Sequence, residues 1–266
     1  MRRVLAGGLD GITGTNQFEA QAQPDGSAAL LTPGTALMAW LFADPRVQSN
    51  LGSCVPLLAG FYPTLLAGRV DPTSLTRGQE LRIGIARPDG PETAALLGLE
   101  RLGLVPVPGL VDFTLTQAAF AQLNIDVMLL RGTSVAATLA ASNDTRPICV
   151  LGTPDATGAL LRDPALPDVP HLRELLGGIP DDPLSTGWRV AAVVAQQAFN
   201  LMLPPLTPAA MIALWQIAVE QAVALPDIRT MAVGQAVRLQ AKPGTLAANP
   251  AALTALRTWF AAYRRK

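Results

Sequence analysis

The sequence predicts an α/β fold in which mostly parallel sheets are flanked by helices. Short apolar runs that are typical of strands alternate with apolar residues at helical spacing, and turns rich in glycine and proline separate them. Half of the 266 residues are hydrophobic and only 15% are charged, so we expect a large core and no disorder. The chain is longer than a typical domain of about 100–150 residues, which predicts one large domain or two lobes.

Three strand-and-helix pairs are expected in the first 142 residues. In each pair an apolar run ends in a small polar turn, and a helical pattern opens directly after that turn. A glycine-rich segment at 7–14 precedes them and predicts a tight turn that leads into a helix at 15–22. The pairs are strand 28–34 with helix 35–43, strand 81–90 with helix 91–104, and strand 125–133 with helix 134–142.

The rest of the chain continues the alternation. A strand is expected at 147–155, a further apolar run follows at 187–195, and the clearest helical pattern covers 207–225. The last helix is expected at 249–266, where Asn249 provides the N-cap and Pro250 the first helical position.

Three prolines at 164, 167 and 170 predict a rigid, extended connector, because each one fixes φ and removes a backbone donor. A helix of one or two turns is expected directly after it, and Gly177 and Gly178 end that helix.

The apolar stretch 190–219 raises the question of a membrane span, which needs about 20 apolar residues. Polar residues and prolines interrupt it, so we interpret the stretch as the core of a soluble protein. These residues are Gln196, Gln197, Asn200, Pro204, Pro205 and Pro208. The apolar part of the first eleven residues is too short for a signal peptide, which predicts a cytoplasmic protein or a mature chain without its leader.

Composition excludes several classes of function. Twenty basic and twenty acidic residues give a formal net charge of zero, so no basic face for nucleic acid is expected. His171 is the single histidine, which argues against most histidine-dependent catalysis. Cys54 and Cys149 have apolar neighbours and are expected to be buried thiols rather than a pair. No zinc spacing, G-x-S-x-G elbow, dinucleotide-binding fingerprint or P-loop lysine occurs, and no metal or cofactor is expected.

Three of the expected turns open helices directly after strands, at 32–35, 86–93 and 131–134. Ligands of open α/β sheets bind beyond the carboxyl ends of strands, and helix N-termini offer N–H groups to a carboxylate or phosphate. Three such turns without a catalytic set favour binding over chemistry. Asp89 and Glu92 lie close enough to form a carboxylate pair, but we interpret them as flexible, solvated loop residues.

Several segments in order resemble the Bug-type solute-binding proteins, the extracytoplasmic receptors related to tripartite tricarboxylate transporters. The strongest are "EAQAQPDGSAALLTPGTALMAW" (19–40), which carries the PDG and GT motifs, and "RPICVLGTPDATGALLRDPALPDVPHLREL" (146–175), which contains the LPDVP connector. Similar segments are 81–100, the helix-then-strand region 116–130, and 203–233. The resemblance implies a two-lobed binding protein of the periplasmic type II class. Its expected lobes are 1–75 with 190–266 and 76–189, with the ligand cleft between them.

The resemblance also implies the ligand-binding residues. They are Thr32, Pro33, Gly34 and Thr35 in the first loop, Ala86, Arg87, Pro88, Asp89, Gly90 and Thr93 in the second, and Arg131, Gly132 and Thr133 after the third strand. The charges of the second loop depart from the family, because Asp89 and Glu92 would repel a dicarboxylate that Arg87 could clamp. His171 replaces the threonine that would form a capping box with Glu174. The family's first strand, glycine loop and helix are expected before residue 1, so their absence predicts a truncated or divergent chain.

The leading hypothesis is therefore a periplasmic, monomeric receptor, not an enzyme, that delivers a small carboxylate to membrane transporter subunits. Its expected mechanism is closure of the two lobes on the ligand. One alternative is a degenerate relative that has lost ligand binding and acts as an interaction protein. A weaker alternative is an enzyme that uses Arg87, Asp89 and Glu92.

Overall fold

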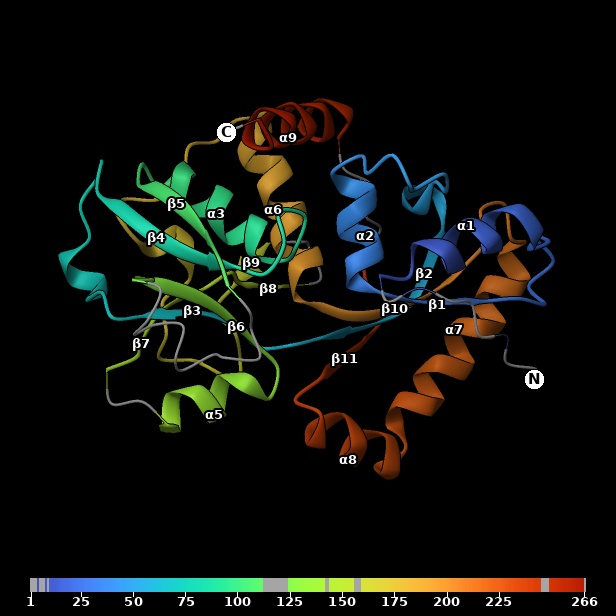
Figure 1. Cartoon of the computed structure of the whole chain (residues 1–266). Helices are drawn as coiled ribbons and strands as arrows, with labels where there is room; N and C mark the ends of the chain where they lie inside the picture. Colours follow the sequence, from blue (N-terminus) through green and yellow to red (C-terminus); the bar gives the residue numbers. More distant parts are fainter. Residues whose placement is uncertain are drawn as a thin grey trace. The chain divides into compact units, whose positions relative to one another are not determined.

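The computed structural model describes residues 4, 8, 10–111, 124–141, 144–155, 159–244 and 249–265 (Figure 1). The chain divides into two units. Unit 1 is formed by Met1–Tyr62 and Gln197–Asn249, and unit 2 by Pro63–Gln196 and Pro250–Lys266. These limits differ from the expected lobes in three places, and they assign the C-terminal helix to unit 2. The assignment of this helix depends on how it packs in the folded chain, and the sequence does not reveal that packing.

The sheet of unit 1 has the order β1-β10-β2-β11. Its strands are β1 (Leu30–Pro33), β10 (Gln197–Leu203), β2 (Val55–Phe61) and β11 (Arg238–Ala241). Every pair in this sheet is antiparallel, from Leu30 opposite Met202 to Arg238 opposite Phe61. The expectation of mostly parallel pairing is therefore wrong for this unit, because its strands come from distant parts of the chain and do not form consecutive crossover units.

Unit 1 contains three of the expected helical patterns and one helix, α8, that the sequence interpretation did not predict. They are α1 (Ile12–Gln21), α2 (Gly34–Leu41), α7 (Ala209–Ala224) and its continuation α8 (Pro226–Gly234). One part of the core joins Leu57 of β2, Leu203 of β10 and Val219 of α7. A short 3-10 turn, η1 (Leu51–Ser53), leads into β2. The expected strand 28–34 and helix 35–43 are thus confirmed to within a few residues.

The sheet of unit 2 mixes both directions in the order β5-β4-β6-β3-β7. Its strands are β3 (Thr64–Gly68), β4 (Glu80–Ile85), β5 (Val105–Leu110), β6 (Val127–Arg131) and β7 (Arg146–Val150). Strand β4 runs parallel to β5 and β6, whereas β3 runs antiparallel to β6 and β7. A two-stranded sheet of β8 (Thr153–Pro154) and β9 (Leu160–Leu161) accompanies it. The parallel part places the ends of β4 and β6 at one edge, where the candidate residues follow.

The described helices of unit 2 are α3 (Glu92–Arg101), α5 (Ser134–Ala141), α6 (Pro183–Gln196) and α9 (Pro250–Tyr263). Helix α6 packs against both α3 and α9 (Figure 1). The apolar run 187–195, which follows the expected strands, is helical and lies inside α6. Its buried residues Trp188, Ala191, Ala192 and Ala195 recur at helical spacing. The helical part of the predicted segment 116–130 falls at 112–123, outside the described residues.

The proline connector leads into a single 3-10 turn, η4 (Leu172–Glu174), which is shorter than the expected helix. The Glu174 carboxylate accepts a hydrogen bond from the His171 backbone N–H at 2.8 Å, so the glutamate half of a capping box is present. Arg162 pairs with the same carboxylate at 2.5 Å. Another 3-10 turn, η2 (Pro72–Ser74), precedes β4. The replacement of threonine by His171 therefore leaves this turn capped.

Both cysteines are buried free thiols, as expected. Burial raises the pKa of Cys54 to about 11 and that of Cys149 to about 12. Within the described ranges, no single helix is long and apolar enough to cross a membrane. Helices α7 and α8 meet the criteria of length and composition only as a pair, bent by 71°.

Candidate functional site

The unit 1 loop lies where β1 ends at Pro33 and α2 begins at Gly34. Gly34 is buried, and a Cβ at this position would lie 2.2 Å from the carbonyl oxygen of Gln197. The close approach of β10 therefore requires glycine at the start of α2. Thr32 is buried, and its hydroxyl has no hydrogen-bond partner among the described residues. Thr35 is exposed and donates to the carbonyl oxygen of Asp10 at 3.2 Å.

The predicted tight turn before α1 is confirmed and lies directly against this loop. Gly11 caps α1 with a φ of 77°, and a Cβ there would come within 2.6 Å of Cδ of Pro33. This left-handed conformation and close contact both favour glycine. The structure thus brings Asp10 and Gly11 to the loop at 32–35, a proximity that the sequence interpretation missed.

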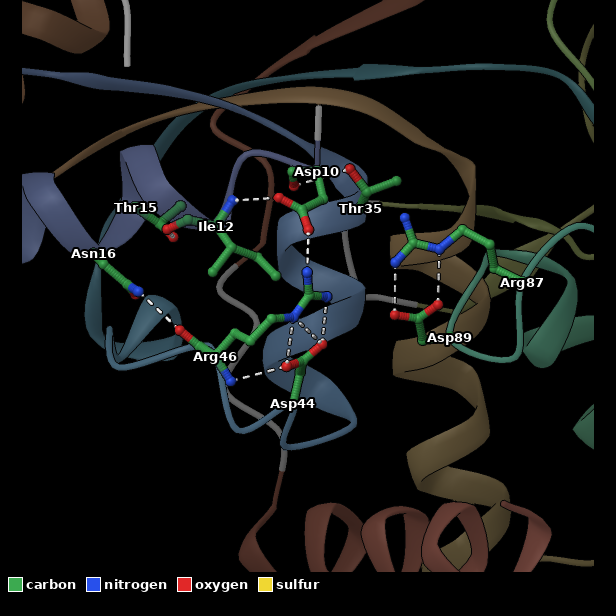
Figure 2. A network of polar contacts seen from close by, with 9 residues as sticks. All are labelled: Asp10, Ile12, Thr15, Asn16, Thr35, Asp44, Arg46, Arg87 and Asp89. Atoms are coloured by element: carbon green, nitrogen blue, oxygen red, sulfur yellow. Dashed lines mark hydrogen bonds and ion pairs between the residues drawn. The ribbon is translucent and has the colours of Figure 1, made fainter. Parts of the chain in front are cut away.

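Asp10, Asp44 and Arg46 form an ion-pair network beside the unit 1 loop (Figure 2). The Asp10 carboxylate accepts from the Ile12 backbone N–H at 3.2 Å and lies 2.8 Å from Arg46. Arg46 also pairs with Asp44 at 2.7 Å, and this hydrogen bond raises its pKa. The N-terminus of α1 therefore has a carboxylate of its own. An aspartate just before a helix is a recognised start signal, whereas no sequence signal identifies Arg46.

The unit 2 turn between β4 and α3 carries the second group of predicted residues. Ala86, Arg87 and Pro88 are exposed, while Gly90 and Thr93 are buried. The Thr93 hydroxyl donates to the carbonyl oxygen of Pro88 at 2.8 Å and thereby holds the turn.

The guanidinium of Arg87 faces the Asp89 carboxylate through two bonds of 3.0 and 2.9 Å (Figure 2). The positive charge of Arg87, which could clamp a ligand carboxylate, thus pairs with Asp89 within the turn.

Glu92 is the first residue of α3 and is only 6% exposed. The interpretation of this carboxylate as a solvated loop residue is therefore wrong, because the start of α3 packs into unit 2. Burial raises the pKa of Glu92, against the opposing effects of its own backbone N–H and of the charges of Arg131 and Arg87. Its Oε2 is buried without a hydrogen-bond partner among the described residues. Neither spacing nor composition distinguished Glu92 from an exposed glutamate.

The third predicted group follows β6. Arg131 is the last residue of that strand, and the Ser134 hydroxyl accepts from its N–H at 3.1 Å and donates to its carbonyl oxygen at 2.7 Å. The N–H of Gly132 donates to the carbonyl oxygen of Pro63 at 3.0 Å, and Thr133 is exposed. Because β4 and β6 are parallel neighbours, the turns at 86–93 and 131–133 lie at the same edge of the sheet.

The predicted residues thus form two sets, one in each unit. At the start of α3 the N–H groups of Thr93 and Ala94 already donate to the carbonyl oxygens of Gly90 and Pro91, so what the helix start offers an anion is the positive end of its dipole. Within the part of the chain that the structure describes, no group of three or more histidine, cysteine, aspartate or glutamate side chains could hold a metal ion.

No family model and no curated protein matches the sequence. The fold is similar to that of a TctC solute-binding protein. A TctC solute-binding protein from Polaromonas has a TM-score of 0.64 and 13% identity, over 97% of this chain and 84% of that chain.

Two further solved structures are similar to the chain. The R. palustris protein Rpa4515 with adipate has a TM-score of 0.50 and 13% identity, over 96% of this chain and 83% of that chain. The periplasmic binding protein BugD has a TM-score of 0.49 and 17% identity, over 97% and 84%. The TctC and BugD structures are named as binding proteins, and at these identities the likeness is one of fold.

Proposed function

We propose that this chain is a periplasmic solute-binding protein, not an enzyme, that captures a small organic acid. The observation that carries the proposal is the fold, which matches a TctC solute-binding protein over 97% of the chain with a TM-score of 0.64. A fold by itself does not establish a function, so the chemistry of the candidate loops has to agree with it.

The loops suit a carboxylate. Helices α2, α3 and α5 each begin at a predicted loop, and their positive dipole ends favour an anion. Hydroxyl groups of Thr35 and Thr133 are exposed beside them. We propose the thirteen residues of the two sets as the ligand-binding residues. Adipate, the ligand of Rpa4515, is a dicarboxylate and thus an example of this class in a protein of the same fold.

The proposed partners are membrane subunits of a tripartite tricarboxylate-type transporter, to which the chain would deliver its ligand as a monomer. The support for this partnership is the likeness of fold to TctC and Bug-type proteins. The prediction of a ligand held between two lobes stays a prediction.

Thermal unfolding against a panel of mono-, di- and tricarboxylates, amino acids and aromatic acids tests the proposal. A ligand at about 100 times its dissociation constant stabilises the folded state by roughly 2.7 kcal/mol. At roughly 2–4 °C per kcal/mol for a chain of this size, the midpoint should rise by roughly 5–11 °C. We expect a selective rise with one class of acid. A folded protein without any rise across the panel would contradict the proposal and favour a relative that acts as an interaction protein.

A further inference from the structure

The carboxyl group of Glu92 is buried at the start of α3 with hydrogen-bonding capacity left unused. The residue is 6% exposed, and Oε2 has no hydrogen-bond partner among the described residues. This oxygen lies over the β4–α3 turn, because a Cβ built on Gly90 would be 2.3 Å from it. An unpaired buried carboxylate oxygen is costly, so a donor that reaches this turn would bind favourably.

The charges around Glu92 favour one kind of donor. Arg87 and Asp89 of the turn pair with each other at 2.9 Å, and Arg131 at the end of β6 acts electrostatically on Glu92. The negative charge of Glu92 also contributes to the raised pKa of Tyr263 in α9. Among the described residues of these two turns, the two arginines balance the two acids. A dicarboxylate would leave this edge of the sheet negative, whereas a solute that carries one ammonium and one carboxylate would keep it neutral.

We propose that Glu92 determines ligand class, with its Oε2 accepting a hydrogen bond from an ammonium group that the solute carries beside its carboxylate. The solute is then an amino acid or another small zwitterion. A charge-assisted bond of this kind is roughly twice as strong as a neutral one. The carboxylate of the solute is left to the positive dipole ends of α3 and α5 and to the exposed hydroxyl of Thr133. The inference rests on the proposed function and narrows its ligand class.

Matched acids that differ in one substituent test the inference. Succinate, malate and aspartate form one set, and propionate, lactate and alanine form the other. Their dissociation constants are measured by calorimetry with the wild-type chain, with Glu92→Gln and with Glu80→Gln. Glu80 is the control because it is exposed at the opposite end of β4. We expect aspartate or alanine to bind the wild-type chain more tightly than the other acids of its set. Glu92→Gln should raise the dissociation constant of that amino acid about tenfold or more. Glu80→Gln should leave this constant unchanged.

A second variant guards against an effect of Glu92→Gln on folding. Gly90→Ala places a methyl group 2.3 Å from Oε2 of Glu92, so the carboxylate must move while the turn keeps its backbone. Introduced alone, Gly90→Ala should weaken binding of the same amino acid. Added to Glu92→Gln, it should have little further effect, since both changes act on one contact. Equal losses in both backgrounds would overturn the assignment of the contact to Glu92.

The outcomes separate this inference from the proposed function. Tightest binding of succinate or propionate, unaffected by Glu92→Gln, would overturn the inference and leave the proposed function standing. If malate or lactate binds most tightly and Glu92→Gln abolishes that binding, the assignment of an ammonium donor is overturned and the donor is a hydroxyl group instead. Absence of binding by every acid of both sets, together with no shift in the wider panel, would remove the proposed function and the inference with it.

Discussion

His171 shows how the burial of one residue makes stability depend on pH. It is 4% exposed, and its Nε2 lies 3.0 Å from the carbonyl oxygen of Leu151. Burial lowers its pKa below the ordinary value of 6.5. The unfolded chain therefore takes up the proton more readily than the folded chain, so this group destabilises the fold as pH falls below about 6.5. The penalty is complete once pH is below the folded pKa.

Because His171 is the chain's single histidine, its contribution can be isolated. We expect the free energy of unfolding of wild type in urea to fall between pH 7.5 and 5.5, and the fall to be smaller in His171→Gln. Carboxylates titrate alike in both proteins and serve as the internal reference. Equal slopes in the two proteins would show that the buried ring does not control stability in this range.

The residue scale also contains the clearest failure of the sequence interpretation. The sequence predicted the turn that holds Arg87, Asp89 and Glu92, but it did not distinguish their environments. Arg87 and Asp89 pair in the turn, whereas Glu92 is buried. All three belong to one short, polar-looking segment, and burial depends on which other elements pack against it. A charged residue in the first turn of a helix is ordinarily exposed, so local reasoning favours the wrong answer for Glu92.

At the scale of elements, the contact between α2 and β10 makes a sharp prediction. Gly34→Ala would place a methyl carbon 2.2 Å from the backbone oxygen of Gln197, so the helix or the strand must shift. We expect a loss of about 1–3 kcal/mol in the free energy of unfolding. Gly234→Ala at the end of α8 is the control, because a Cβ there meets no atom within 4 Å. That change should be neutral or slightly stabilising; equal losses from both would contradict the steric argument.

Most elements could be predicted because their signals are local. Helix α7 follows from its apolar spacing, and α9 from Asn249 and Pro250 at its start. Direction of pairing is not local: β1 is antiparallel to β10, although each is followed by a helix. An apolar run such as 187–195 also fits a buried strand as well as a buried helix. In the structure the run is part of helix α6. Its Trp188 packs against α3 and donates its indole N–H to the Ala94 carbonyl oxygen at 2.9 Å.

For the whole molecule, the two buried thiols provide one probe for each unit. Cys54 belongs to unit 1 and Cys149 to unit 2, and burial raises the pKa of both. Since the thiolate is the reactive form, neither should react with a disulfide reagent at pH 8 in the folded protein. Each should become reactive only when its own unit opens.

Single variants Cys54→Ala and Cys149→Ala allow the two exposures to be followed separately during urea unfolding. Coincident midpoints would indicate cooperative unfolding of both units, and separate midpoints would rank their stabilities. Rapid reaction of either thiol without denaturant would contradict the burial on which the prediction depends.

The sequence by itself determined the α/β class, the positions of most strands and helices, and the turns at which helices begin after strands. These features depend on residues close together in the chain: apolar spacing, prolines, glycines and caps. Only the tertiary structure decided the antiparallel sheet of unit 1, the assignment of α9 to unit 2, the pairing of Arg87 with Asp89, and the burial of Glu92. Each of these features depends on which side chains and strands come into contact when the chain folds. The spacing of residues along a short segment does not reveal those contacts.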